Sequence, residues 1–214
     1  MKKIVALLLS LGLLLLTLMS LAGCAQPPRV EDIYDRVVQL VEDSYRINTV
    51  FYGPGLPSIK ADSDYAELNH VYFGYAQAGK YEFVTDASAF PSIASIKAAA
   101  EKVYSRGFLE DVLYVAAFDG YAFEDSMGGS VFAVARYMED GNGFLISSDP
   151  DDTRYTAMRI YDYSTMEVLS LGRSDACKVR MSSWLEDSPE RVEPVTVSLI
   201  LQDGQWFLDS FTGG

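Results

Sequence analysis

The stretch Val195 to Phe211, VTVSLILQDGQWFLDSF, indicates the fold of this chain more clearly than any other segment. In its first half every second residue is Val or Leu, and this alternation places one set of side chains on one face of a β-strand. Asp203-Gly204 then fits a tight two-residue turn, after which Trp206 and Leu208 continue the apolar pattern. The stretch therefore predicts an antiparallel hairpin with one buried face.

The segments before Gly120 are mostly helical in pattern. Residues 30–51 carry apolar side chains at helical spacing, with acids at the beginning, until the Gly- and Pro-rich segment 53–57 forbids continuation. A second helix is expected from a cap at Ser92 or Ser95 to Arg106-Gly107, and a third over 108–118. Between them, 53–70 reads as an irregular connection, and 71–75 with 80–85 as a short hairpin.

After Gly120 the chain reads as strands joined by polar turns. Helices early and antiparallel strands late predict an α+β fold, in which N-terminal helices pack on a twisted C-terminal antiparallel sheet. We expect residues 30–214 to form a single domain, because this length supports one sizeable core.

The first 24 residues have the order of an export signal: Lys2 and Lys3, an apolar stretch, and small residues before Cys24. The run Leu21-Ala22-Gly23-Cys24 resembles the end of a bacterial lipoprotein signal. This resemblance implies a signal peptide over 1–23, a lipidated Cys24, and a tether over 24–29 that holds the domain on the extracytoplasmic face of the membrane. An uncleaved transmembrane anchor is the alternative, because the apolar stretch is nearly long enough to span a bilayer.

The charge of the chain is strongly acidic. It has 17 Lys and Arg against 30 Asp and Glu, and without Lys2 and Lys3 the mature chain would have 15 bases and a formal charge of −15. This sign excludes nucleic acid and anionic lipid headgroups as expected partners. A basic protein, a cationic wall polymer or a divalent cation fits better, although an acidic surface also serves simply to keep an exported domain soluble.

The order of these segments resembles the exported inhibitors of DL-endopeptidases, the hydrolases that trim cell-wall peptides. The resemblance is in the lipoprotein leader, the long first helix, the segment SIASIKAAAEKVYSRGFLEDVLYVAAF at 92–118 and the hairpin at 195–211. It implies a cystatin-like or nuclear-transport-factor-like arrangement of helix against curved sheet, and binding of a wall hydrolase at its substrate cleft. No functional residue of that family carries over to this chain.

The residues do not predict an enzyme. His70 is the one histidine, and no Gly-x-Ser-x-Gly elbow or papain-type cysteine context accompanies it. With Cys24 lipidated, only Cys177 remains, and it follows an alternating pattern typical of a buried cysteine. We expect no cofactor and no metal centre, although a pair of carboxylates for glycoside hydrolysis stays open as a third possibility.

Four residues are candidates for contact with a partner. Asp149, Asp151 and Asp152 form the densest acidic loop, which could meet a partner or bind calcium, although it lacks the spacing of an EF-hand. Trp184 ends a predicted strand and could stand at a sheet rim, where it would favour a protein or glycan contact. The leading hypothesis is a membrane-anchored binding module that inhibits a cell-wall hydrolase. The alternative is a ligand-binding or scaffold domain that uses the concave sheet face as a pocket.

Overall fold

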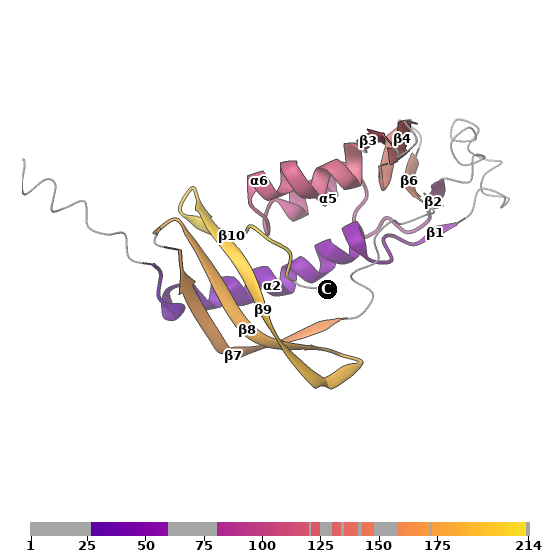
Figure 1. The fold of residues 1–214 in the computed structure, drawn as a ribbon. Coiled ribbons are helices and arrows are strands. Elements are labelled where there is room, and N and C mark those ends of the chain that lie inside the picture. Colours follow the sequence, from indigo (N-terminus) through magenta and orange to yellow (C-terminus); the bar gives the residue numbers. More distant parts are fainter. Residues whose placement is uncertain are drawn as a thin grey trace, which may run out of the picture.

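The computed structural model describes residues 27–59, 81–119, 121–124, 130–133, 135–140, 143–147, 158–171 and 173–212. These residues confirm the α+β class, with a long helix and shorter helices beside antiparallel sheets (Figure 1). The helical elements are α2 (Val30–Tyr52), α5 (Ile93–Ala100), α6 (Arg106–Phe108), η1 (Leu109–Leu113) and η2 (Val115–Asp119), and the strands are β1 (Ser58–Ile59), β2 (Tyr81–Val84), β3 (Tyr121–Glu124), β4 (Ser130–Ala133), β5 (Tyr137–Asp140), β6 (Gly143–Ser147), β7 (Arg159–Ser170), β8 (Ala176–Leu185), β9 (Ser188–Gln202) and β10 (Gln205–Leu208).

Helix α2 confirms the first predicted helix. Its apolar stripe is buried, with Ile33, Val37 and Leu40 at most 2% exposed, because their spacing places them on one side of the helix. Asp32 accepts a hydrogen bond from the backbone N–H of Arg29 at 3.2 Å, which satisfies a donor at the helix start. The helix ends at Gly53. No helix among the described residues is long and apolar enough to cross a membrane.

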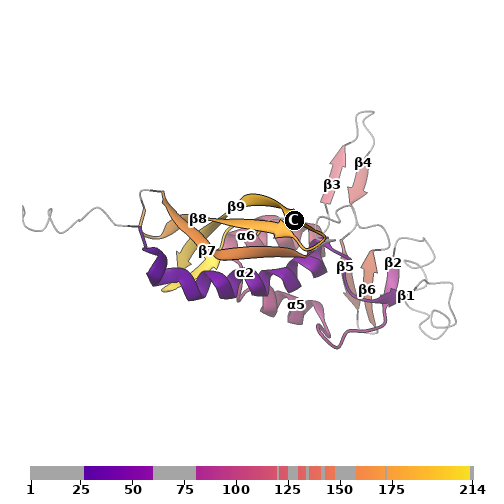
Figure 2. The same ribbon diagram turned by 90° about the horizontal axis from the view of Figure 1, so that it is seen from below.

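The main sheet has the strand order β10-β9-β8-β7, and all of its neighbouring pairs are antiparallel. The predicted hairpin is confirmed: Gln202 pairs with Gln205 around Asp203 and Gly204, whose φ angles of 50° and 79° suit a tight hairpin turn. Strand β8 alternates in burial, and its inward apolar side chains belong to the same core cluster as those of α2, which lies along this sheet (Figures 1 and 2). The inward residues of β8 are Cys177, Val179, Met181 and Ser183.

A buried polar cluster joins the C-terminal segment to α2. Thr212 lies between the helix and β7, where Ser44 and Asn48 contact its hydroxyl and Tyr161 donates to its carbonyl at 2.6 Å. Tyr104 donates to the side-chain carbonyl of Asn48. The space between helix and sheet is therefore filled partly by the protein's own C-terminal segment.

The middle helices differ from their predicted boundaries. Ser92 caps α5 as expected, because its hydroxyl accepts from the N–H of Ser95 at 3.1 Å. The helix ends at Ala100, however, and Arg106 begins the next helix instead of ending this one. The segment that follows is widened into the π-helical turns η1 and η2, which a hydrophobic period does not reveal.

A second four-stranded sheet has the order β1-β2-β6-β5, and β3 pairs with β4. Strand β2 lies within the later half of the expected hairpin of 71–75 with 80–85, whereas 71–75 lie outside the described residues. Among the described residues, β2 pairs with β1 and with β6. Residues 53–70 are also not wholly irregular, since β1 lies among them. Buried Arg136 connects this sheet to the end of α2, where its Nε donates to the carbonyl of Val50 at 2.9 Å.

Candidate functional site

The structure describes one of the predicted site residues. Cys24 and the acidic residues Asp149, Asp151 and Asp152 lie outside the described residues, as does His70. Trp184 is the next-to-last residue of β8 and pairs with Ile160 of β7. It stands close to the end of the sheet, as predicted, but its side chain is half-buried instead of exposed.

The strand beside Trp184 is interrupted by a bulge. Ser183 pairs with Glu193 and Leu185 pairs with Ser188, so residues 189–192 of β9 lie opposite Trp184 alone. A bulge bends its strand and turns side chains away from the regular sheet. Val192 is consequently 58% exposed, the highest value among the large apolar side chains that the structure describes as exposed.

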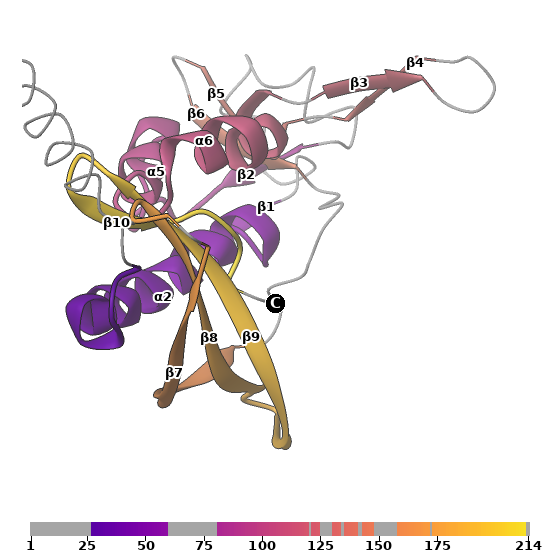
Figure 3. The same cartoon turned by 60° about the vertical axis from the view of Figure 1, so that its left-hand side comes forward.

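These residues lie at the β8–β9 end of the sheet, where side chains of both sheet faces meet: Trp184 lies on the opposite face from Leu185, its neighbour on β8. Val192, Trp184 and Leu185 lie here, and Met158, which is 45% exposed, directly precedes β7. Arg159 and Arg191 complete the set, and we refer to these six residues as the distal surface. Figures 1 and 3 show this end of the sheet projecting past α2, away from the indigo start of that helix and from the β9–β10 turn.

A small notch of about 180 Å³ opens in the distal surface. It is formed by the ends of β7, β8 and β9, and its side chains are polar except for one leucine. Arg191 pairs with Glu193 across it, with 2.9 Å between Nε and Oε1. Arg159 donates from Nη1 to the hydroxyl of Ser183 at 3.0 Å. The lining residues are Arg159, Leu185, Ser188, Arg191 and Glu193.

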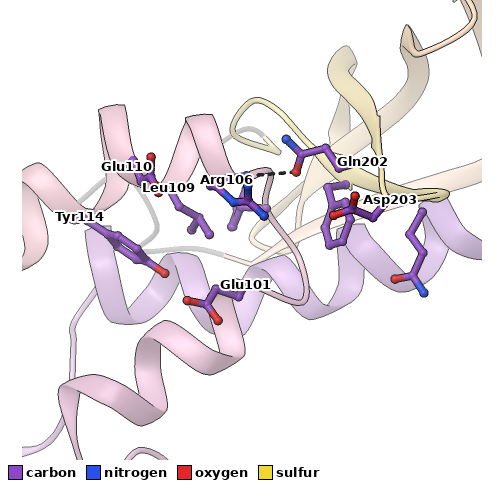
Figure 4. Close-up of a pocket in the computed structure, with 10 residues that line it drawn as sticks. Glu101, Arg106, Leu109, Glu110, Tyr114, Gln202 and Asp203 are labelled. Carbon is purple, nitrogen blue, oxygen red and sulfur yellow. Dashed lines mark hydrogen bonds between the residues drawn. The ribbon is translucent and has the colours of Figure 1, made fainter.

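A larger cleft of about 580 Å³ lies at the opposite end of the sheet, between the β9–β10 turn and the α5–η1 segment (Figure 4). Its acids come from three separate elements, and its walls include Tyr114 and Phe207. Burial, together with the charges of Glu101 and Glu110, raises the pKa of Tyr114 to about 12. The lining residues are Glu101, Tyr104, Arg106, Leu109, Glu110, Tyr114, Gln202, Asp203, Gln205 and Phe207.

The geometry of this cleft does not favour carboxylate chemistry. Glycoside hydrolysis needs two carboxyl groups that face each other across a substrate. Glu101, Glu110 and Asp203 are exposed side chains, and the carboxyl groups of Glu101 and Glu110 point to different sides of the cleft in Figure 4. The described residues also contain no group of three or more His, Cys, Asp and Glu that could hold a metal ion.

Sequence reasoning missed Arg159 and Arg191, the two cations of the distal surface. Two prolines, Pro189 and Pro194, lie on either side of Arg191, and they could have indicated that this strand is irregular. Proline lacks a backbone N–H, so within sheets it marks edges and bulges. The prolines predict an irregular strand, but they do not show that Arg191 lines the same notch as Arg159, which is more than thirty positions earlier.

Comparison with known proteins finds no match for this sequence among protein-family models or among curated proteins.

Proposed function

We propose that this protein is a lipid-anchored, extracytoplasmic binding module that restrains a cell-wall DL-endopeptidase through its distal surface. The observation that carries the proposal is the position of that surface: it lies at the end of the sheet away from Val30, the first residue of α2. The six residues from Cys24 to Arg29 span at most about 20 Å when fully extended. A chain held at Cys24 would therefore keep Val30 near the membrane and direct the distal surface away from it.

The composition of the distal surface supports a protein partner. Trp and Arg are enriched among the residues that dominate binding energy at interfaces, and Met is enriched at interfaces generally. Trp184 is half-buried, so its side chain is neither fully enclosed nor fully exposed. A rigid aromatic side chain loses little conformational entropy when it is bound.

The alternative of a ligand pocket on the concave sheet face has less support. Val37 and Leu40 of α2 and Met181 of β8 are at most 1% exposed in the described part of the chain, so side chains fill the space between this helix and the sheet. Thr212 fills more of the same space. A pocket binder would need an apolar cavity there.

Site-specific crosslinking tests the proposal. A photoreactive amino acid at Val192 in the full chain, expressed in its native envelope, should capture a wall peptidase. The same probe at Leu171, which is 46% exposed just after β7 ends, is the matched control and should not. Capture must be accompanied by slower release of wall peptides by that peptidase. Equal capture at both positions, or capture without inhibition, would contradict the proposal.

A further inference from the structure

Arg159 is an incompletely paired cation in a strongly acidic protein. Its Nε atom is buried and has no hydrogen-bond acceptor among the described residues, where the guanidinium group donates only from Nη1, to the neutral hydroxyl of Ser183. Arg173 and Arg180, by comparison, each have a carboxylate partner within 2.7 Å. A buried N–H without an acceptor is costly, so a structure that retains one calls for an explanation.

Tyr161, two residues along β7, uses its hydroxyl to donate to Thr212, and the groups of β8 and β9 that line the notch do not supply the missing acceptor. From β8 come Ser183, whose hydroxyl also donates to the carbonyl of Glu193 at 3.1 Å, and the apolar Leu185. From β9 come Ser188, Arg191 and Glu193, but the carboxylate of Glu193 is taken by Arg191. The notch therefore places two guanidinium groups beside one carboxylate. Among its lining residues it has an excess of one positive charge.

We propose that the notch binds a carboxylate side chain of the partner protein. Nε and Nη2 of an arginine form a planar fork that matches the two oxygens of a carboxylate, and no hydrogen bond of the described residues uses this fork of Arg159. The hydrogen bond from Nη1 to the hydroxyl of Ser183 holds the other side of the guanidinium group. Because Nε is buried, binding through this fork requires the side chain to rotate until the Nε–H reaches the bound oxygen.

This inference rests on the distal surface being the binding surface, and it adds the chemistry of the partner: an aspartate or glutamate side chain that enters the notch. The acids near the turn, Glu186, Asp187 and Glu190, are all exposed. They repel a generally acidic partner, so the notch selects a single carboxylate on an otherwise neutral or basic surface.

The test uses N-acetyl-glutamate amide as the probe and the arginine Nε–H signals of the ¹⁵N-labelled full chain in detergent. The signal of Arg159, assigned by its loss in Arg159→Lys, should shift saturably. The neutral probe N-acetyl-glutamine amide should leave it unmoved, and the signal of Arg173, at the other end of the sheet, should not saturate with either probe. In Arg159→Lys, which keeps the charge and loses the fork, the shift of the Arg191 signal should require at least tenfold more probe.

The inference would be overturned if the Arg159 signal did not shift, if its shift did not saturate, or if the two probes shifted it equally. The notch would then be a site for ordered water. Capture of a wall peptidase at Val192 alongside such a result would leave the proposed function standing. Failure of both experiments would contradict both the inference and the proposed function.

Discussion

Asn48 and Thr212, which are 164 positions apart in the sequence, are hydrogen-bonded to each other inside the core, with 3.0 Å between Nδ2 and Oγ1. The same hydroxyl lies 2.9 Å from that of Ser44. Through these bonds the C-terminal segment fixes α2 against the sheet that carries the distal surface.

Thr212→Val should therefore destabilise the protein. The substitution keeps the shape of the side chain but leaves the Asn48 amide without its acceptor, which costs about 1–3 kcal/mol. Urea unfolding gives the change in unfolding free energy. Thr196→Val, on an exposed position of β9, is the control and should change it by less than about 0.5 kcal/mol. Equal effects of the two substitutions would show that the buried cluster contributes nothing specific.

Gly55 should not tolerate a side chain. Its φ is +78°, and an added Cβ would collide with Ile146 and lie 2.9 Å from Nη2 of Arg136. Left-handed strain and overpacking together predict that Gly55→Ala costs about 2–5 kcal/mol. The measurement is again urea unfolding.

Two other glycines separate the causes of that cost. Gly204 has a φ of +79° and open space around its Cβ direction, so Gly204→Ala should show the backbone strain alone, about 1–2 kcal/mol. Gly107 has open space and no positive φ, and Gly107→Ala should be neutral or slightly stabilising. A cost at Gly55 no larger than that at Gly204 would show that the collision is relieved by movement.

Cys177 should be chemically inert in the folded protein. Burial raises the pKa of its thiol to about 11, so at pH 8.5 the reactive thiolate is roughly 100-fold rarer than in the unfolded chain. Alkylation by iodoacetamide, followed by mass spectrometry of the Cys177 peptide, should be slower by at least this factor than in urea. Similar rates in the two conditions would contradict the buried position.

The same pKa shift predicts how stability changes with pH. The folded pKa is higher than the unfolded one, so this thiol's contribution is fully present below about pH 8.5 and is lost as the pH rises through about 11. Between about pH 8.5 and 9.5, below the range in which tyrosines lose their protons, the slope should be reduced in Cys177→Ala. An unchanged slope in that window would assign the effect to other groups.

Local pattern in the sequence predicted the elements that have a clear period. The alternation around Val197 and Leu199 placed both side chains in the core, and the turn at Asp203 and Gly204 formed as expected, because hairpin pairing is decided by neighbouring residues. The smaller sheet was not predictable in this way. Strand β2 pairs with β6, more than sixty positions later, and such pairing depends on tertiary packing.

The candidate site could be predicted only where it depends on local pattern. Trp184 was singled out because it lies near the end of a regular strand. Arg159 was not found, because its importance comes from Ser183 and Arg191 on two other strands, and from a bulge whose only trace in the sequence is the pair of prolines. The π-helical turns beside the larger cleft were also not predicted, because their apolar spacing resembles that of an α-helix.

The most direct test of the account measures how fast the envelope's own DL-endopeptidase releases wall peptides in the presence of the full-length protein. Wild-type protein and Leu171→Glu should slow this release equally. Val192→Glu, which places a charge on the most exposed apolar side chain of the distal surface, should need at least about tenfold more protein for the same inhibition, which corresponds to about 1.4 kcal/mol of binding free energy. Equal inhibition by all three proteins, or none by the wild type, would contradict the claim that the distal surface restrains a wall hydrolase.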